Sequence, residues 1–72
     1  MSGAVRIDAR GMRCPWPAVR LAKALRGGAK SVTVIADDPN APTELAAVAT
    51  AANATIEIVL DEVLPTFIIT LR

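Results

Sequence analysis

Apolar and polar residues alternate in four short segments of the chain, and alternation with a period of two is typical of half-buried β-strands. The segments comprise residues 5–10, 31–36, 55–60 and 66–71. The side chains expected to face the core are Val5, Ile7 and Ala9, then Val32, Val34 and Ala36, then Ile56, Ile58 and Leu60, and finally Phe67, Ile69 and Leu71. The pattern therefore predicts four strands, and the last two are close enough to form an antiparallel hairpin.

The segment after the first strand has helical spacing instead. Pro15 and Pro17 favour a helix start, because the first turn needs no backbone N–H from them. Gly27 and Gly28 predict that this helix ends at about Arg26. The apolar side chains expected on its buried face are Ala18, Val19, Ala22 and Leu25.

A second helical segment follows the turn residues 37–40. It begins near Pro42, with either Asn40 or Ala41 as its N-cap, and continues to about Ala52. Asn53 then suits a left-handed C-cap position. The side chains expected on the buried face are Leu45, Val48, Ala49 and Ala52.

The predicted order is β-α-β-α-β-β in one domain of residues 1–72. Crossover connections of this kind are right-handed. We therefore expect an α/β protein, a two-layer sandwich in which both helices cover one face of a four-stranded mixed sheet. The opposite face is expected to be open and to carry Ile35, Val59 and Ile68 among polar residues, which allows a monomer or a weak dimer.

The cysteine and histidine content restricts the chemistry. The chain has one cysteine, Cys14, and no histidine. An intramolecular disulfide is impossible, and the side chains that hold structural zinc are missing. Histidine-dependent hydrolytic triads are excluded as well. We therefore expect neither a metal site nor a cofactor, and a core built from the 53% of hydrophobic residues alone.

Charge is unevenly distributed although the net charge is only +1. Residues 1–36 carry a net charge of +6 and residues 37–72 a net charge of −5, which is typical of a protein that meets charged partners. Trp16 and Phe67 are the only aromatic residues, so direct stacking on nucleic acid is not favoured. No membrane span or signal segment is expected, and an unpaired cysteine favours the cytoplasm.

Cys14 is the candidate reactive residue. It precedes a helix, where free N–H groups attract an anion, and we expect Arg10, Arg13 and Arg20 to lower its pKa. Exchange between sulfur atoms needs only a thiolate nucleophile and a thiolate leaving group, so it requires no histidine. Without a second cysteine, a sulfur adduct on Cys14 must be removed by another protein.

Residues 8–17, which end in Cys-Pro-Trp-Pro, together with Ala36-Asp37-Asp38-Pro39, resemble the TusA (SirA-like) family of sulfur carriers over essentially the whole chain. The resemblance implies that Cys14 accepts sulfane sulfur as a persulfide from a cysteine desulfurase or rhodanese and relays it to an acceptor protein. The family serves tRNA thiolation, molybdenum-cofactor biosynthesis and sulfur oxidation. Residues 40–45 lack a basic residue that relatives often have, so donor, acceptor and pathway stay open.

Other residues of the motifs have supporting roles in this interpretation. Asp8 is expected to bind backbone near Gly11, and Gly11 to adopt a positive φ or to permit close packing. Asp37 and Asp38 are interpreted as turn and cap residues rather than a metal-binding pair, and we expect them near Cys14. Trp16 is either an exposed docking residue or a shield over the loop. The residues expected to dock partners are Trp16, Arg20, Lys23, Arg26, Asp37 and Asp38.

Two other functions remain compatible with the sequence. A non-catalytic RNA- or protein-binding regulatory module would use the basic half of the chain to contact phosphate or acidic surfaces. A thiol redox sensor would need only one cysteine of low pKa.

Overall fold

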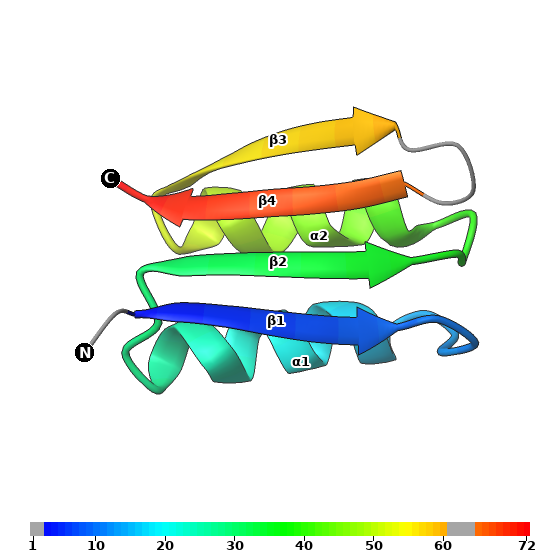
Figure 1. Ribbon diagram of the computed structural model, residues 1–72, viewed down its shortest axis with the longest axis horizontal. Helices are drawn as coiled ribbons and strands as arrows, with labels where there is room; N and C mark the ends of the chain where they lie inside the picture. The colour runs from blue at the N-terminus through cyan, green and yellow to red at the C-terminus, as the bar shows by residue number, and fades with distance from the viewer. Residues whose placement is uncertain (1–2, 61–64) are drawn as a thin grey trace.

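The computed structural model describes residues 3–60 and 65–72. Within them the chain forms the predicted β-α-β-α-β-β order (Figure 1). The elements are β1 (Ala4–Ala9), α1 (Trp16–Arg26), β2 (Ser31–Ala36), α2 (Ala41–Ala51), β3 (Ala54–Leu60) and β4 (Pro65–Leu71). Every predicted element is present, with its boundaries within two residues of those expected.

The four strands form one mixed sheet in the order β1-β2-β4-β3. β1 and β2 are parallel, whereas β4 is antiparallel to both β2 and β3. The predicted hairpin between the last two strands is therefore confirmed. Its loop was expected to span Asp61 to Pro65; residues 61–64 lie outside the described part of the chain, and Pro65 is the first residue of β4.

Both helices lie on the same face of the sheet and begin at the same end of it (Figure 1). The core fills the space between the helices and the sheet. Its largest fully buried side chains include Phe67 and Ile69 of β4, Leu21 of α1 and Leu45 of α2. Full burial of such side chains stabilises a fold by about 1.5–3 kcal/mol each, so a chain without disulfides depends on this layer.

Three side chains expected in the core are substantially exposed. Val19 is exposed because the buried residues of α1 are Pro17, Ala18 and Leu21. Only Ala18 of these was predicted, so the buried face is rotated from the predicted one. Val5 is near the start of the edge strand β1. Ile58 pairs with Phe67 in register, but it lies in the other edge strand and remains 50% exposed.

Backbone caps end both helices as the sequence predicts. After α1, Gly28 has a φ of 103°, its N–H donates to Leu25 O, and the N–H of Ala29 donates to Ala24 O. These two bonds form a Schellman motif. After α2, Asn53 has a φ of 60°. At the start of α2 the structure resolves the open choice of cap, because Asn40 occupies the N-cap position.

Candidate functional site

Cys14 lies at the end of the molecule where β1 and β2 finish and both helices begin (Figure 1). Two short turns precede the helix: the Met12 N–H donates to Ala9 O at 3.1 Å and the Trp16 N–H to Arg13 O at 2.8 Å. Pro15 is the N-cap of α1, and the peptide bond that joins it to Cys14 is cis. The cysteine is therefore held just outside the helix, as the sequence predicts, and its side chain is half-buried.

The loop that carries Cys14 is joined to the loop after β2. The backbone N–H of Gly11 donates to the Asp37 carboxylate, with N–O distances of 3.0 and 3.2 Å. Gly11 has a φ of 81°, and a side chain added there would meet nothing within 4 Å. The glycine is thus required by its backbone conformation and not by close packing. This contact links residues 26 positions apart.

Asp8 binds the backbone next to Gly11, as expected. Its carboxylate accepts the backbone N–H of Arg10 at 3.2 Å and two guanidinium hydrogen bonds at 2.8 and 2.7 Å. The N–H of Gly11 is taken by Asp37 instead. The side-chain and backbone hydrogen bonds from Arg10 lower the pKa of Asp8 from its ordinary 3.8 to about 2. Asp8 therefore stabilises the turn after β1.

The residues after β2 place further carboxylates beside Cys14. Asp38 accepts the backbone N–H of Asn40 at 3.1 Å, and its carbonyl accepts the N–H of Ala41 at 3.0 Å. Asp37 and Asp38 thus act as turn and cap residues, as predicted. Glu44 lies in the first turn of α2 and is half-buried. Within the described residues, no group of three or more His, Cys, Asp or Glu side chains is placed so that it could hold a metal ion.

The electrostatic environment of Cys14 is opposite to the one expected. Burial, a hydrogen bond to Glu44, and the negative charges of Glu44 and Asp38 raise the pKa of the Cys14 thiol. Arg10, expected to favour the thiolate, instead makes an ion pair of 2.7 Å with Asp8. Arg13 and Arg20 are exposed. The prediction of a lowered pKa was therefore wrong, because burial and the carboxylates of Glu44 and Asp38 oppose ionisation of the thiol.

Glu44 is the site residue that sequence reasoning missed. Sequence reasoning assigns it no role, because it lies 30 positions from Cys14 along the chain. The strand topology would have indicated this position. β1 and β2 are parallel neighbours, so the segments that follow them lie at the same end of the sheet. An acidic residue in the first turn after β2 is consequently placed near a residue in the first turn after β1.

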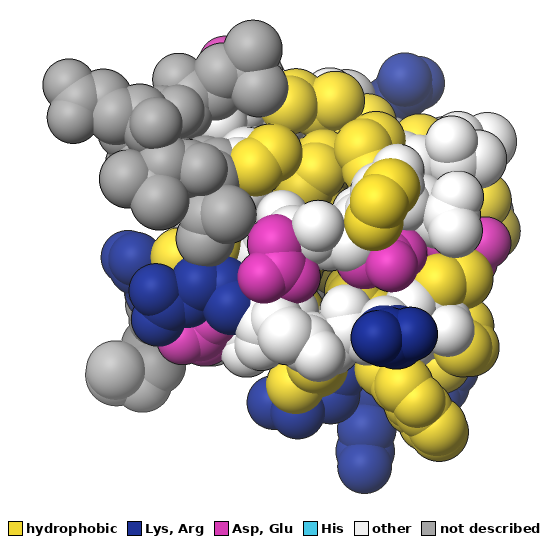
Figure 2. Space-filling view, turned by 90° about the vertical axis from the view of Figure 1, so that its right-hand side faces the viewer, with side chains coloured by type: hydrophobic (Ala, Val, Ile, Leu, Met, Phe, Trp, Pro, Cys, Tyr) yellow, Lys and Arg dark blue, Asp and Glu magenta, His cyan; other side chains and the backbone are white. Residues whose placement is uncertain are grey.

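The end of the molecule that carries Cys14 is acidic near its middle. Figure 2 views this end and shows Asp and Glu side chains across its central part, with one Lys or Arg side chain directly beneath them and others further below and to the left. A shallow hollow of about 400 Å³ lies there between the two loops. It is lined by Gly11, Met12, Arg13, Asp37, Asp38 and Pro39.

The remaining predicted docking residues are distributed around α1. Trp16 is 59% exposed, so it is not a shield over the loop. Arg20, Lys23 and Arg26 are all exposed. Pro17 is fully buried and has a packing role at the start of the helix. The basic side chains thus extend along the helix away from Cys14 instead of surrounding the sulfur.

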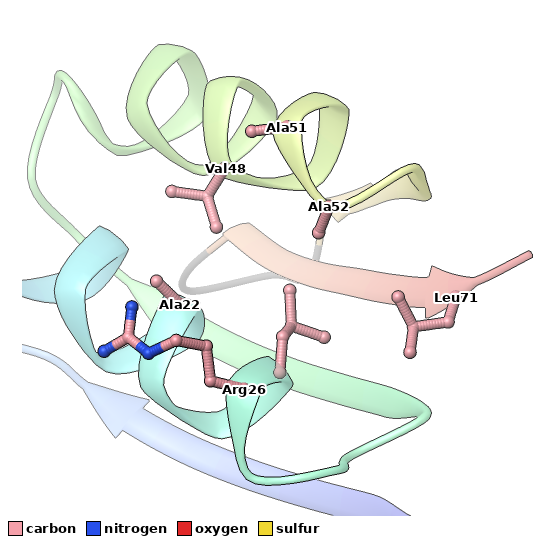
Figure 3. Close-up of a pocket in the computed structure, with 7 residues that line it drawn as sticks. Ala22, Arg26, Val48, Ala51, Ala52 and Leu71 are labelled. Carbon is pink, nitrogen blue, oxygen red and sulfur yellow. The ribbon is translucent and has the colours of Figure 1, made fainter.

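A second hollow lies at the opposite end of the helical layer, between the last turns of α1 and α2 (Figure 3). It has a volume of about 520 Å³ and is mainly apolar. Small or aliphatic side chains and one guanidinium line it: Ala22, Leu25, Arg26, Val48, Ala51, Ala52 and Leu71. Cys14 and the carboxylates beside it do not contribute to this hollow.

Residues 5–72 match the family model described as "Sulfurtransferase TusA". The chain belongs to the TusA sulfurtransferase family. A solved structure has the same fold: the SirA-like protein from Desulfitobacterium hafniense is 30% identical and has a TM-score of 0.80. The similarity covers 92% of this chain and 95% of that one. No curated protein matches the sequence significantly.

Membership of the TusA family indicates a role in sulfur transfer together with partner proteins. The Cys-Pro-Trp-Pro segment and the Ala-Asp-Asp-Pro segment both lie at the end of the sheet described above. Within the described residues, no helix is long and apolar enough to cross a membrane.

Proposed function

We propose that this protein is a sulfur carrier that accepts sulfane sulfur on Cys14 as a persulfide and passes it to an acceptor protein. The observation that carries the proposal is the position of Cys14, which is half-buried in the loop between β1 and α1 and lies two residues before α1 begins. Family membership supports the general role in sulfur transfer. With no other cysteine in the chain, unloading must be carried out by a second molecule.

The reaction conserves atoms and charge. The Cys14 sulfur bonds to the outer sulfur of a donor persulfide, the donor's S–S bond breaks, and the electron pair remains on the donor's inner sulfur. The proton released by Cys14 balances the proton taken up by the departing thiolate. Delivery is the same step with the carrier as donor. A cysteine desulfurase or a rhodanese is a suitable donor class.

The partner surface in this proposal includes α1 as well as the loops. Trp16 is exposed directly after the cysteine and its proline, and exposed tryptophans are enriched among residues that dominate binding energy. Arg20, Lys23 and Arg26 extend the surface with positive charge, which accelerates encounter with acidic partner surfaces. Asp37 and Asp38 complete it beside Cys14.

A direct test loads the protein with a cysteine desulfurase and cysteine. We expect the intact mass to increase by one sulfur atom, about 32 Da, with the increase removed by a reducing thiol. Cys14→Ser should show no increase. A matched control combines Cys14→Ser with Thr33→Cys, which moves the only thiol to the open face of the sheet; it should load poorly. Absence of an adduct on the wild type with every donor class would refute the proposal.

The two alternative functions are less well supported. A redox sensor requires a cysteine with a high thiolate fraction, whereas burial and the neighbouring carboxylates raise the pKa of Cys14. A phosphate-binding module requires positive charge at its contact surface, and the end that carries Cys14 is acidic near its middle (Figure 2).

A further inference from the structure

The two edge strands of the sheet are protected to different degrees. β1 and β3 each have one neighbouring strand within the described residues (Figure 1), so each leaves a row of backbone N–H and C=O groups without a partner in the sheet. β1 carries Arg6 and Asp8, and charged side chains discourage the pairing of edge strands. β3 contains no lysine, arginine, proline or glycine, and Glu57 is its one charged residue. The β3 edge is therefore the less protected of the two.

Aliphatic side chains are exposed on both faces of β3. Ile58 pairs with Phe67 of β4, so it faces the helices, but it is 50% exposed whereas Phe67 is fully buried. The helical layer thus ends before it covers this edge of the sheet. Val59 faces the opposite side, because successive residues of a strand alternate, and it is 41% exposed. A further strand beside β3 would bury apolar surface on both faces.

The helix beside this edge is almost uncharged. α2 packs against β3, and Glu44 is the only charged residue among positions 41–53. By contrast, α1 packs against β1 and carries the exposed Arg20, Lys23 and Arg26. Depletion of charged residues is typical of the central part of a protein–protein interface. The β3 side of the molecule therefore suits a neutral partner with a free strand edge, and β3 of a second copy has both properties.

We propose that two copies of this chain associate through antiparallel pairing of β3 with β3, about a two-fold axis at Ile58, so that their two four-stranded sheets become one. Ile58 then lies opposite Ile58 of the second copy on the side of the helices. Glu57 lies opposite Val59 of the second copy, so no two carboxylates are directly opposed. This pairing closes after two copies, whereas pairing of β3 with the charged β1 edge would leave free edges and continue without end.

The interface is small and leaves the Cys14 end accessible. β3 has seven residues, a length of about 23 Å, and a single strand pairing buries less than the roughly 1,200 Å² of stable complexes. We therefore expect a reversible dimer with a dissociation constant between about 10 μM and 1 mM. β3 lies at the opposite edge of the sheet from β1, and the two-fold axis places the two Cys14 residues at opposite ends of the common sheet.

Sedimentation velocity over a series of protein concentrations tests the inference, with a reducing agent present so that Cys14 forms no disulfide between copies. The wild type should change from monomer to dimer as its concentration increases. Ile58→Lys should raise the dissociation constant at least about tenfold, because two cations oppose each other and two aliphatic contacts are lost. Val5→Lys is the matched control: Val5 is 39% exposed on the β1 edge, and its substitution should leave the dissociation constant unchanged.

A mixture of variants tests the symmetry of the pairing. Ile58→Lys and Ile58→Glu should each be mainly monomeric when alone, whereas an equimolar mixture should associate again, because opposite charges then face each other across the axis. Circular dichroism establishes that both variants are folded. If either is not, Ile58→Cys in a Cys14→Ser background should form a disulfide between copies on mild oxidation, and Val5→Cys in the same background should form little.

The outcomes distinguish this pairing from other arrangements. A wild type that is monomeric at every concentration up to about 1 mM, or a dimer that Ile58→Lys does not weaken, would overturn the proposal. Assemblies larger than a dimer would contradict a closed pairing, and a mixture that fails to associate would contradict an axis at Ile58. These results do not depend on sulfur loading, because Cys14 takes no part in the interface.

Discussion

The two ends of the helical layer differ in kind although the same two helices form both. At the end where the helices start, carboxylates accept backbone N–H groups of the loops: Asp37 accepts that of Gly11 across the two loops, and Asp38 accepts that of Asn40 within one loop. At the end where they finish, backbone caps close α1 and an apolar hollow lies between the helices (Figure 3).

The difference follows from the direction of the chain. The strands β1 and β2 are parallel and each is followed by a helix, so the ends of both strands and the starts of both helices lie at the same end of the sheet. Backbone N–H groups of first turns have no partner within their helix, and carboxylates are favourable there. The opposite edge has no such demand for acidic side chains. Carboxylates are therefore found near Cys14, whereas apolar side chains line the hollow at the opposite end.

Loss of the shared core should affect both ends most strongly. Leu45 is fully buried in α2, directly after Glu44, so Leu45→Ala should lower the free energy of unfolding by about 2–5 kcal/mol. Urea denaturation measures the change. If this variant does not fold, Ile69→Val in β4 should cost about 1 kcal/mol. A negligible loss in both would mean that the ends are stabilised independently of the core.

Gly11→Ala should be the most damaging change confined to the Cys14 end. The backbone φ of 81° is strained for a residue with a side chain, which costs about 1–2 kcal/mol. The Gly11–Asp37 link would loosen as well, exposing the loop. Hydrogen exchange should therefore accelerate in residues 10–16 more than at the C-terminal ends of the helices. Uniform acceleration throughout would contradict the separation of the two ends.

Acid should affect the Cys14 end through Asp8. Its pKa is about 2 in the folded protein and lies near 3.8 for an unpaired carboxyl. Because the folded value is depressed, the stabilisation is present above pH 4 and is lost as the pH falls toward 2. Thermal melting between pH 5 and pH 2 measures it. Asp8→Asn should show a shallower decline over this window, and a decline identical to that of the wild type would argue against the Arg10 contact.

Filling the far hollow should have the smallest effect. Ala22→Leu places a larger aliphatic side chain in the groove between the helices and should raise the free energy of unfolding by up to about 1 kcal/mol. The rates at which Cys14 reacts with charged reagents should not change. Altered rates would show that the two ends are coupled, and a loss of stability would show that the groove is not open to a larger side chain.

Much of the fold was predictable because local patterns determine it. Period-two alternation identifies all four strands, and the prolines and glycines delimit α1. The exposed positions were less predictable. Ile58 has the alternation of a core residue, but its exposure depends on the helices not covering that part of an edge strand. The exposure of Val19 likewise depends on how α1 is rotated about its axis against the sheet.

The sequence by itself determined the order of elements, the single cysteine at a helix start and the resemblance to the TusA family. Only the tertiary structure decided what surrounds the sulfur. Sequence proximity favoured Arg10 and Arg13, whereas folding pairs Arg10 with Asp8 and brings Glu44 to Cys14 from 30 positions away. The physical reason is that electrostatic interactions depend on distance in space, and parallel strand pairing sets that distance here.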